Sequence, residues 1–113
     1  AKQLFGNPHK RPTAVFVTSD EMAIGAILAA RDLGLQVPYD VSVIGVDDHE
    51  LSDFFGLSTI AQFPALQGRM AVDLIMDQLN PGHREIAQAN TALPFELIVR
   101  SSTARPNIAR PTN

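Results

Sequence analysis

The chain has 113 residues, of which 45% are hydrophobic and 19% are charged, and its formal net charge is −3 at pH 7. This is the size of one domain with a modest core, and the composition is ordinary for a soluble globular protein. The acidic balance gives this segment no electrostatic means of binding nucleic acid or anionic membrane by itself, and the lack of cysteine excludes disulfides, thiol nucleophiles and zinc–thiolate sites.

The first elements are predicted from local composition. Residues 1–12 mix Gly, Pro, Asn and basic residues, which indicates a helix end or a loop. Residues 14–18 form a continuous β-rich run that includes Val15, Phe16 and Val17, so we expect a strand covered on both faces. No apolar run approaches the roughly 20 residues that span a bilayer, and no segment resembles a signal peptide.

A helix is predicted at residues 20–33. It begins in a dense start signal, in which any of three residues could be the N-cap: Thr18, Ser19 and Asp20. Gly25 weakens a helix by roughly 1 kcal/mol relative to Ala, so we expect close packing against the sheet or another helix to compensate. Gly34 follows the last apolar position and predicts a left-handed C-terminal cap.

The stretch VSVIGVDD at residues 41–48 predicts a second buried strand, at 41–46, that ends in Asp47 and Asp48. Strand, helix and strand make one βαβ unit with a right-handed crossover. Parallel strands point the same way, so Ser19 and Asp20 should emerge at the same sheet edge as Asp47 and Asp48. Ligands bind beyond the carboxyl ends of strands in such sheets, although Asp also opens ordinary turns.

The second half of the chain is expected to continue this pattern. The predicted segments are a loop or short helix at 49–56 that displays Phe54 and Phe55, a strand at 58–62, a helix at 65–79, a polar loop at 83–91, a last strand at 93–100 and a mobile tail at 104–113.

The sequence lacks the usual patterns of catalytic and metal sites. His9, His49 and His83 are far apart and have no metal-ligand spacing. GxSxG, GxGxxG and Walker-type phosphate loops are missing. Asp47 and Asp48 are adjacent at a strand end, where neighbouring side chains point apart, so they do not suggest an acid–base pair. We therefore expect no enzyme activity, no metal and no cofactor.

Several motifs in a fixed order resemble the effector-binding domain of the LacI/GalR family of bacterial transcriptional repressors. They are PTAVF at 12–16, TSDEMAIGA at 18–26, LGLQVPYDVSVIGVDD at 33–48, LSTI at 57–60 with Gln62, Gly68-Arg69, and LPFELIVRSST at 93–103. The resemblance covers nearly all of the chain between residues 12 and 103. It implies an α/β fold with a parallel, periplasmic-binding-protein-like (Rossmann-like) sheet, present here as an incomplete fragment.

The resemblance also implies a domain organisation and partners. Residues 1–113 would be the C-terminal part of a ligand-binding domain, with the N-terminal helix-turn-helix domain absent. The expected partners are a small-molecule effector such as a sugar, a second copy in a homodimer, and operator DNA through the missing domain only. The protein would be cytoplasmic, with no membrane partner. The alternative is a periplasmic sugar-binding protein of a transport system, which has the same fold.

Four residues match effector-contact positions of the family. Asp47 aligns with the acid that accepts hydrogen bonds from sugar hydroxyls, and Ser19 with a polar contact. Gln62 aligns with a polar residue on the hinge side of the cleft, although Phe63 stands where the family usually has Pro. Phe16 would be an apolar wall for a sugar face, or equally a plain core residue.

The resemblance assigns other roles to the remaining candidates. Asp20 is interpreted as a helix cap and Asp48 as a structural residue. The dimer-interface candidates are Ile24, Ile27, Leu28, Phe54 and Phe55. The alternative for each of these is simple burial, and Ile27 is the first among them that we expect in the core.

Overall fold

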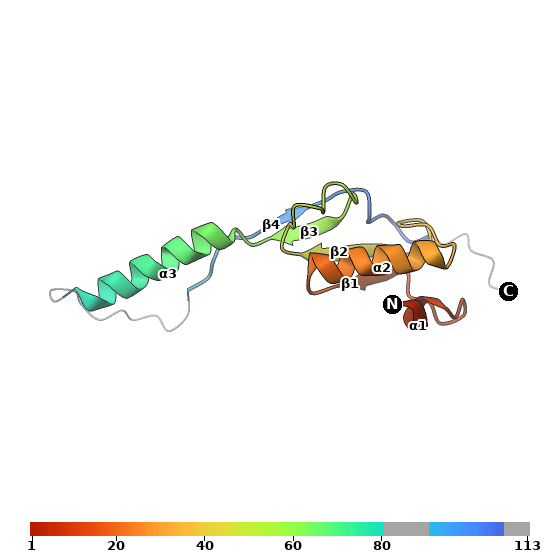
Figure 1. Ribbon diagram of the computed structural model, residues 1–113, viewed down its shortest axis with the longest axis horizontal. Helices are drawn as coiled ribbons and strands as arrows, with labels where there is room; N and C mark the ends of the chain where they lie inside the picture. Colours follow the sequence, from red (N-terminus) through yellow and green to blue (C-terminus); the bar gives the residue numbers. More distant parts are fainter. Residues whose placement is uncertain (81–90, 108–113) are drawn as a thin grey trace.

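The structure is a computed structural model that describes residues 1–80 and 91–107. Its elements, in chain order, are α1 (Lys2–Phe5), β1 (Ala14–Phe16), α2 (Asp20–Asp32), β2 (Ser42–Val46), β3 (Ser58–Ala61), α3 (Pro64–Leu79) and β4 (Glu96–Ile98) (Figure 1). Most of the polar loop predicted at 83–91, and the end of the tail predicted to be mobile, lie outside the described residues.

The four strands form one sheet in the order β1-β2-β3-β4. β1, β2 and β3 are parallel, with Val15 beside Val43 and Gly45 beside Thr59, which confirms the predicted βαβ unit. β4 is antiparallel to β3. The chain runs from β3 directly into α3, and β4 then lies beside β3 in the opposite direction (Figure 1). The fold is therefore mixed α/β with a mostly parallel sheet.

The core lies between α2 and one face of the sheet. Two contact clusters line up along the helix. In one, Ala23 and Ile27 pack with Val43 and Leu57. In the other, alanines of α2 pack with Phe5 and Val41. The alanines allow the helix to lie close to the sheet, and the burial of each large apolar side chain contributes about 1.5–3 kcal/mol to folding.

The closing motif RSST at 100–103 ties β2 to β3 at the edge where these strands begin. Ser102 is 3% exposed; its backbone amide donates to Gly56 O, and its hydroxyl donates to Val43 O. Ser58 N donates to Ser102 Oγ at 2.8 Å, and the Ser58 and Thr103 hydroxyls lie 2.7 Å apart. This segment therefore holds the starts of β2 and β3 together, at the sheet edge opposite Asp47.

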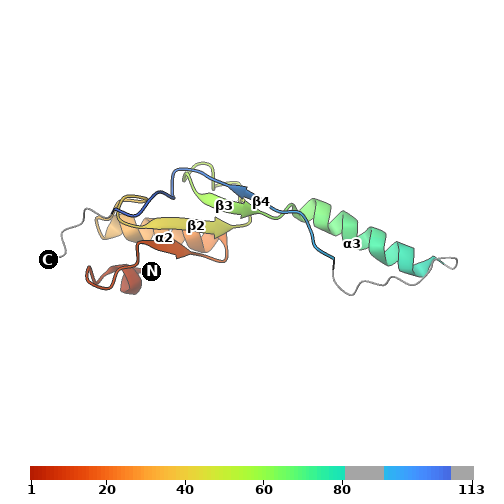
Figure 2. The ribbon, with the colours of Figure 1, turned by 180° about the vertical axis from the view of Figure 1, so that it is seen from behind.

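The sheet face away from α2 is open, which corrects the prediction that the first strand is covered on both faces. Figure 2 shows the sheet from this side, with α2 behind it. Phe16, on the edge strand β1, is 60% exposed, and Leu97 on β4 is 55% exposed. The prediction was wrong because none of the described elements packs on this face.

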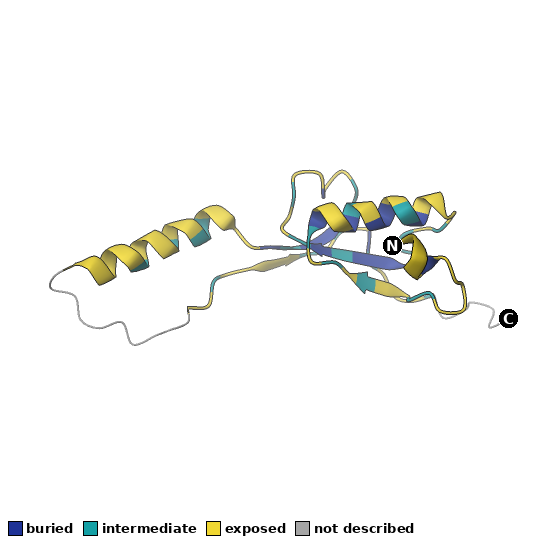
Figure 3. Cartoon of the chain, turned by 60° about the horizontal axis from the view of Figure 1, so that its bottom comes forward, coloured by how far each residue is buried: buried dark blue, intermediate teal, exposed yellow. Residues whose placement is uncertain are grey.

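Helix α3 lies away from the sheet and has no buried residue (Figure 3). The predicted helix is present, but its apolar side chains Val72, Ile75, Met76 and Leu79 are all more than half exposed. The radius of gyration is 19.7 Å, whereas a compact domain of this length would have about 13 Å. Neither α3 nor any other helix in the described ranges is long and apolar enough to cross a membrane.

Gly25, within α2, and Gly34, just beyond its end, have different surroundings. Gly34 follows α2 with φ of +73°, and Leu35 N donates to Ala30 O at 2.9 Å, which confirms the predicted left-handed end. Gly25 was expected to pack closely, and this was wrong. It is exposed, and a Cβ built there would meet nothing within 4 Å.

Candidate functional site

The carboxyl ends of β1, β2 and β3 meet at one edge of the sheet (Figure 1). Polar residues follow each of these ends: Asp47 and Asp48 come directly after β2, Gln62 comes directly after β3, and Ser19 and Asp20 come after Val17 and Thr18 at the end of β1. The Asp20 side chain bonds to residues that follow β2 and to a residue within β3. The predicted convergence of the two polar strand ends is therefore confirmed.

Ser19 is the N-cap of α2, which settles the choice among the three cap candidates. Its backbone is extended, and its Oγ accepts a hydrogen bond from Met22 N at 3.3 Å. Capping uses an acceptor position of the hydroxyl and leaves its proton to donate elsewhere. Ser19 as a whole is half-buried.

Asp20 is not the helix cap that the sequence suggested. It is the first residue of α2, fully buried, and both of its carboxylate oxygens are used. Oδ2 accepts from His49 N at 2.9 Å and from Ser52 Oγ at 2.5 Å, while Oδ1 accepts from Thr59 Oγ1 at 2.7 Å. The positive end of the helix dipole also stabilises the carboxylate there. An acid at a helix start was the only sequence signal, and it does not distinguish this role from capping.

Gly45 provides the space for this buried carboxylate. A Cβ built on Gly45 would lie 2.2 Å from Asp20 Oδ1, which no real structure tolerates. We expect Gly45→Ala to lower the free energy of unfolding by about 1–3 kcal/mol through overpacking. The matched change Gly25→Ala should instead raise it by about 0.5–1 kcal/mol, because the added methyl enters open space on a helix. Urea unfolding of both variants in the full-length protein compares the two free energies of unfolding. Equal changes in the two variants would contradict the conclusion that Gly45 is needed to make room for Asp20.

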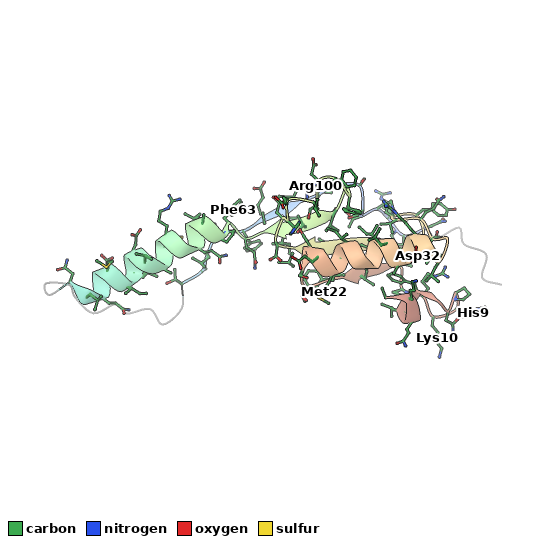
Figure 4. All side chains as sticks on the ribbon, in the orientation of Figure 1. His9, Lys10, Met22, Asp32, Phe63 and Arg100 are labelled. Atoms are coloured by element: carbon green, nitrogen blue, oxygen red, sulfur yellow. The ribbon has the colours of Figure 1, made fainter. Side chains whose placement is uncertain are left out.

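Asp48 is held by an ion pair. Its Oδ1 accepts from Arg100 Nη2 at 3.0 Å, and its backbone amide donates to Thr59 Oγ1 at 3.2 Å. Arg100 Nη1 also donates to Leu57 O, and the Arg100 side chain is only 19% exposed (Figure 4). The interpretation of Asp48 as a structural residue is therefore supported.

Asp47 is exposed, as Asp48 is, but it differs from Asp48 because its side chain has no partner among the described residues. Within the described part of the chain, no hydrogen bond or ion pair engages this side chain, although its amide donates to Ile60 O at 2.9 Å. Asp47 has φ of +122° and Asp48 has φ of +53°. Non-glycine residues seldom adopt such conformations, and those that do concentrate at functional sites. The turn therefore presents one free carboxylate at the sheet edge.

Gln62 and Phe16 lie at two different places. Gln62 is exposed beyond β3, and its backbone carbonyl accepts a hydrogen bond from Gln67 Nε2 at 2.7 Å. Phe63, at the junction between β3 and α3, has φ of +53° (Figure 4). Phe16 instead lines an apolar hollow of ≈ 320 Å³ that it shares mainly with residues of β1, α1 and α2. The structure thus groups Ser19, Asp47 and Gln62 along one edge and places Phe16 beside α1.

The dimer-interface candidates fall into two groups. Ile27 is 2% exposed and packs in the core. Leu28 is 45% exposed and Phe54 is 83% exposed. Ile24 and Phe55 are partly buried against the core, and the Phe55 ring packs edge-on to Phe54 with centroids 5.3 Å apart. Leu28 and Phe54 therefore have the free apolar surface that a contact with another chain requires.

The chemistry available at the edge is hydrogen bonding. A free carboxylate, a hydroxyl and an amide side chain offer both acceptors and donors to a polar ligand. Among the described residues, no group of His, Asp and Glu side chains could hold a metal ion.

The periplasmic binding protein-like domain family matches residues 1–103. The chain belongs to this family. It is 45% identical over 97 residues to the transcriptional repressor PurR of Edwardsiella ictaluri, a match that covers 84% of this chain and 28% of the repressor. This periplasmic binding protein-like chain therefore spans less than a third of that relative.

Two solved structures have the same fold. The Lac repressor dimer bound to operator and the anti-inducer ONPF has 37% identity and a TM-score of 0.79, over 92% of this chain and 36% of the repressor chain. A LacI-family regulator of Lactobacillus casei with bound sucrose has 32% identity and a TM-score of 0.72, over 90% of this chain and 38% of that chain. These likenesses confirm the family resemblance and the α/β fold class inferred from the motifs.

Proposed function

We propose that this periplasmic binding protein-like chain is the C-terminal part of the effector-binding domain of a LacI-type transcriptional regulator. Its role would be to supply one wall of a small-molecule site. The observation that carries the proposal is the exposed Asp47 carboxylate at the carboxyl end of β2, on a backbone held in an unusual conformation. The names of the similar proteins, which are repressors rather than enzymes, support the same role.

The residues at the edge suit a ligand rich in hydroxyl groups. Asp47 can only accept hydrogen bonds, and it offers up to about four lone-pair positions to them. Ser19 and Gln62 can each donate or accept. The regulator of Lactobacillus casei with bound sucrose is consistent with this ligand class. We therefore propose a sugar or a similar hydroxylated metabolite as effector. Phe16 is retained as an apolar contact to be tested separately, because it lies beside α1.

Regulation would follow from a shift between conformations. An effector changes an equilibrium only by binding one arrangement better than another. In the proposed cytoplasmic homodimer, that shift would change how the N-terminal DNA-binding domains meet operator DNA. The exposed side chains of Leu28 and Phe54 are the first candidates for the dimer contact, with Ile24 and Phe55 behind them.

A periplasmic transport protein with the same fold is the second candidate. The order of motifs from VPYDVSVIGVDD to LIVRSST favours the regulator. The sequence of the full reading frame distinguishes the regulator from the transport protein, because a regulator has a helix-turn-helix domain upstream of this chain. A secretion signal in that place would overturn the regulator proposal.

Ligand screening on the full-length protein tests the proposed effector class. Sucrose, glucose and other sugars would be added singly while thermal unfolding is followed. A true effector at 100 times its dissociation constant should stabilise the folded protein by about 2.7 kcal/mol and raise Tm. The same compound should change binding to DNA fragments that the protein selects from its genome. A panel that moves neither Tm nor DNA binding would count against the sugar class.

A further inference from the structure

The turn after β2 directs three consecutive backbone amides to three different acceptors. Asp47 N donates to Ile60 O at 2.9 Å, within the ladder between the strands. Asp48 N donates to Thr59 Oγ1 at 3.2 Å, and His49 N donates to Asp20 Oδ2 at 2.9 Å. Two of the three acceptors are therefore side chains, from β3 and from the start of α2.

These two side chains act as a single unit. The Thr59 hydroxyl accepts from Asp48 N and donates its own proton to Asp20 Oδ1 at 2.7 Å, so its donor and one acceptor position are both used. Asp20 and Thr59 are both fully buried. Hydrogen bonds in such a low-dielectric site are stronger than in water, and a partner that is lost there is not replaced.

The unit acts on a backbone that needs support. Asp47 and Asp48 both have positive φ, and residues held in sparsely populated conformations persist only where the surrounding structure over-determines them. A small rotation of this turn would swing the Asp47 carboxylate, which has no side-chain partner of its own among the described residues.

We propose that Asp20 and Thr59 are positioning residues that hold the turn at Asp47 and thereby aim its carboxylate. The role of Asp47 as effector contact rests on the proposed function, whereas the holding of the turn does not. Neither positioning residue needs to touch the ligand, because both are buried beneath the turn.

Hydrogen exchange in the full-length protein, without any ligand, tests the holding of the turn. In the parent protein the amides of Asp48 and His49 should exchange at least tenfold more slowly than exposed amides of the 50–56 loop. Thr59→Val keeps the shape but removes the hydroxyl, and it should speed exchange at both amides at least tenfold. Thr59→Ser restores the hydroxyl and should return the exchange to within threefold of the parent.

Thr103→Val is the matched control. The Thr103 hydroxyl bonds to Ser58 Oγ where β3 begins, so its loss removes a hydroxyl contact that involves neither Asp20, nor Thr59, nor an amide of the turn. We expect exchange at Asp48 and His49 to remain within twofold of the parent. Equal acceleration by Thr59→Val and Thr103→Val would overturn the proposal. Loop-like exchange at these amides in the parent would do so as well, and that measurement needs no variant to fold.

Calorimetric titration with sucrose and glucose gives the second readout. If the parent binds either sugar, Thr59→Val should weaken binding at least tenfold, and Thr59→Ser and Thr103→Val should stay within threefold. Unchanged sugar affinity in Thr59→Val, together with faster exchange, would overturn the claim that the turn aims Asp47. If the parent binds neither sugar, sucrose and glucose are excluded as effectors, while the exchange data still judge whether Asp20 and Thr59 hold the turn.

Discussion

Replacing Asp47 by alanine in the full-length protein should abolish the response to effector while DNA binding remains intact. The carboxylate is exposed and free of structural partners among the described residues, so its removal should not unfold the domain. Each charge-assisted hydrogen bond contributes about 1.5–3 kcal/mol, so the loss of even one weakens effector binding by roughly 10- to 150-fold. Titrating the protein–DNA complex with the effector found by screening measures the shift of the induction curve.

Asp32→Ala is the matched control for this change. Asp32 is also an exposed aspartate, but it lies at the far end of α2 and pairs with Lys2 at 3.1 Å (Figure 4). Exposed pairs of this kind contribute about 0–1 kcal/mol. The induction curve of Asp32→Ala should therefore match the parent. An unchanged curve for Asp47→Ala would remove Asp47 from the effector site.

The isolated 113-residue chain should self-associate. Its α3 exposes Val72, Ile75, Met76 and Leu79 on a helix with no buried residue, and Phe16 is exposed on the edge strand β1. Open strand edges and contiguous apolar surface both promote association. Sedimentation over a range of concentrations should show species larger than one chain.

The apolar side of α3 can be tested as the cause. Replacing Ile75 and Leu79 together by lysine should shift the chain towards monomer, because two charges would then have to be buried in any contact. Asp73→Lys changes charge on the same helix without removing an apolar side chain, and it should leave the association largely unchanged. A parent chain that sediments as a monomer and melts cooperatively would contradict the prediction.

The predicted elements were correct where the apolar pattern of a segment and the neighbouring elements of the chain that pack on it are close in sequence. The continuous apolar runs at Val15 and Val43 are strands, and the apolar spacing around Ile27 is a helix packed on them. Chain order then required the two polar strand ends to share an edge, since strands of a βαβ unit are parallel. The Gly34 cap followed from the same local logic, because glycine is the residue that adopts positive φ without cost.

The errors arose where the sequence pattern of a segment does not show which other part of the molecule packs against it. The helix predicted at 65–79 is present as α3, but the spacing of its apolar residues cannot say what covers them, and here none of the described elements does. Gly25 suggested close packing by the same reasoning, and it faces open space. For Phe16, a continuous apolar run could not reveal that β1 is an edge strand.

The sequence by itself determined the βαβ unit, the family and the edge at which Asp47 emerges, because these depend on local pattern and on chain order. Only the tertiary structure decided that Ser19 caps the helix, that Asp48 pairs with Arg100, and that the buried Asp20 joins Thr59 beneath the turn. Asp20 bonds across 29 to 39 positions of the chain, a separation at which no local pattern indicates the partner. These distant contacts engage the side chains of Asp20 and Asp48. Among the described residues they leave the Asp47 carboxylate without a partner.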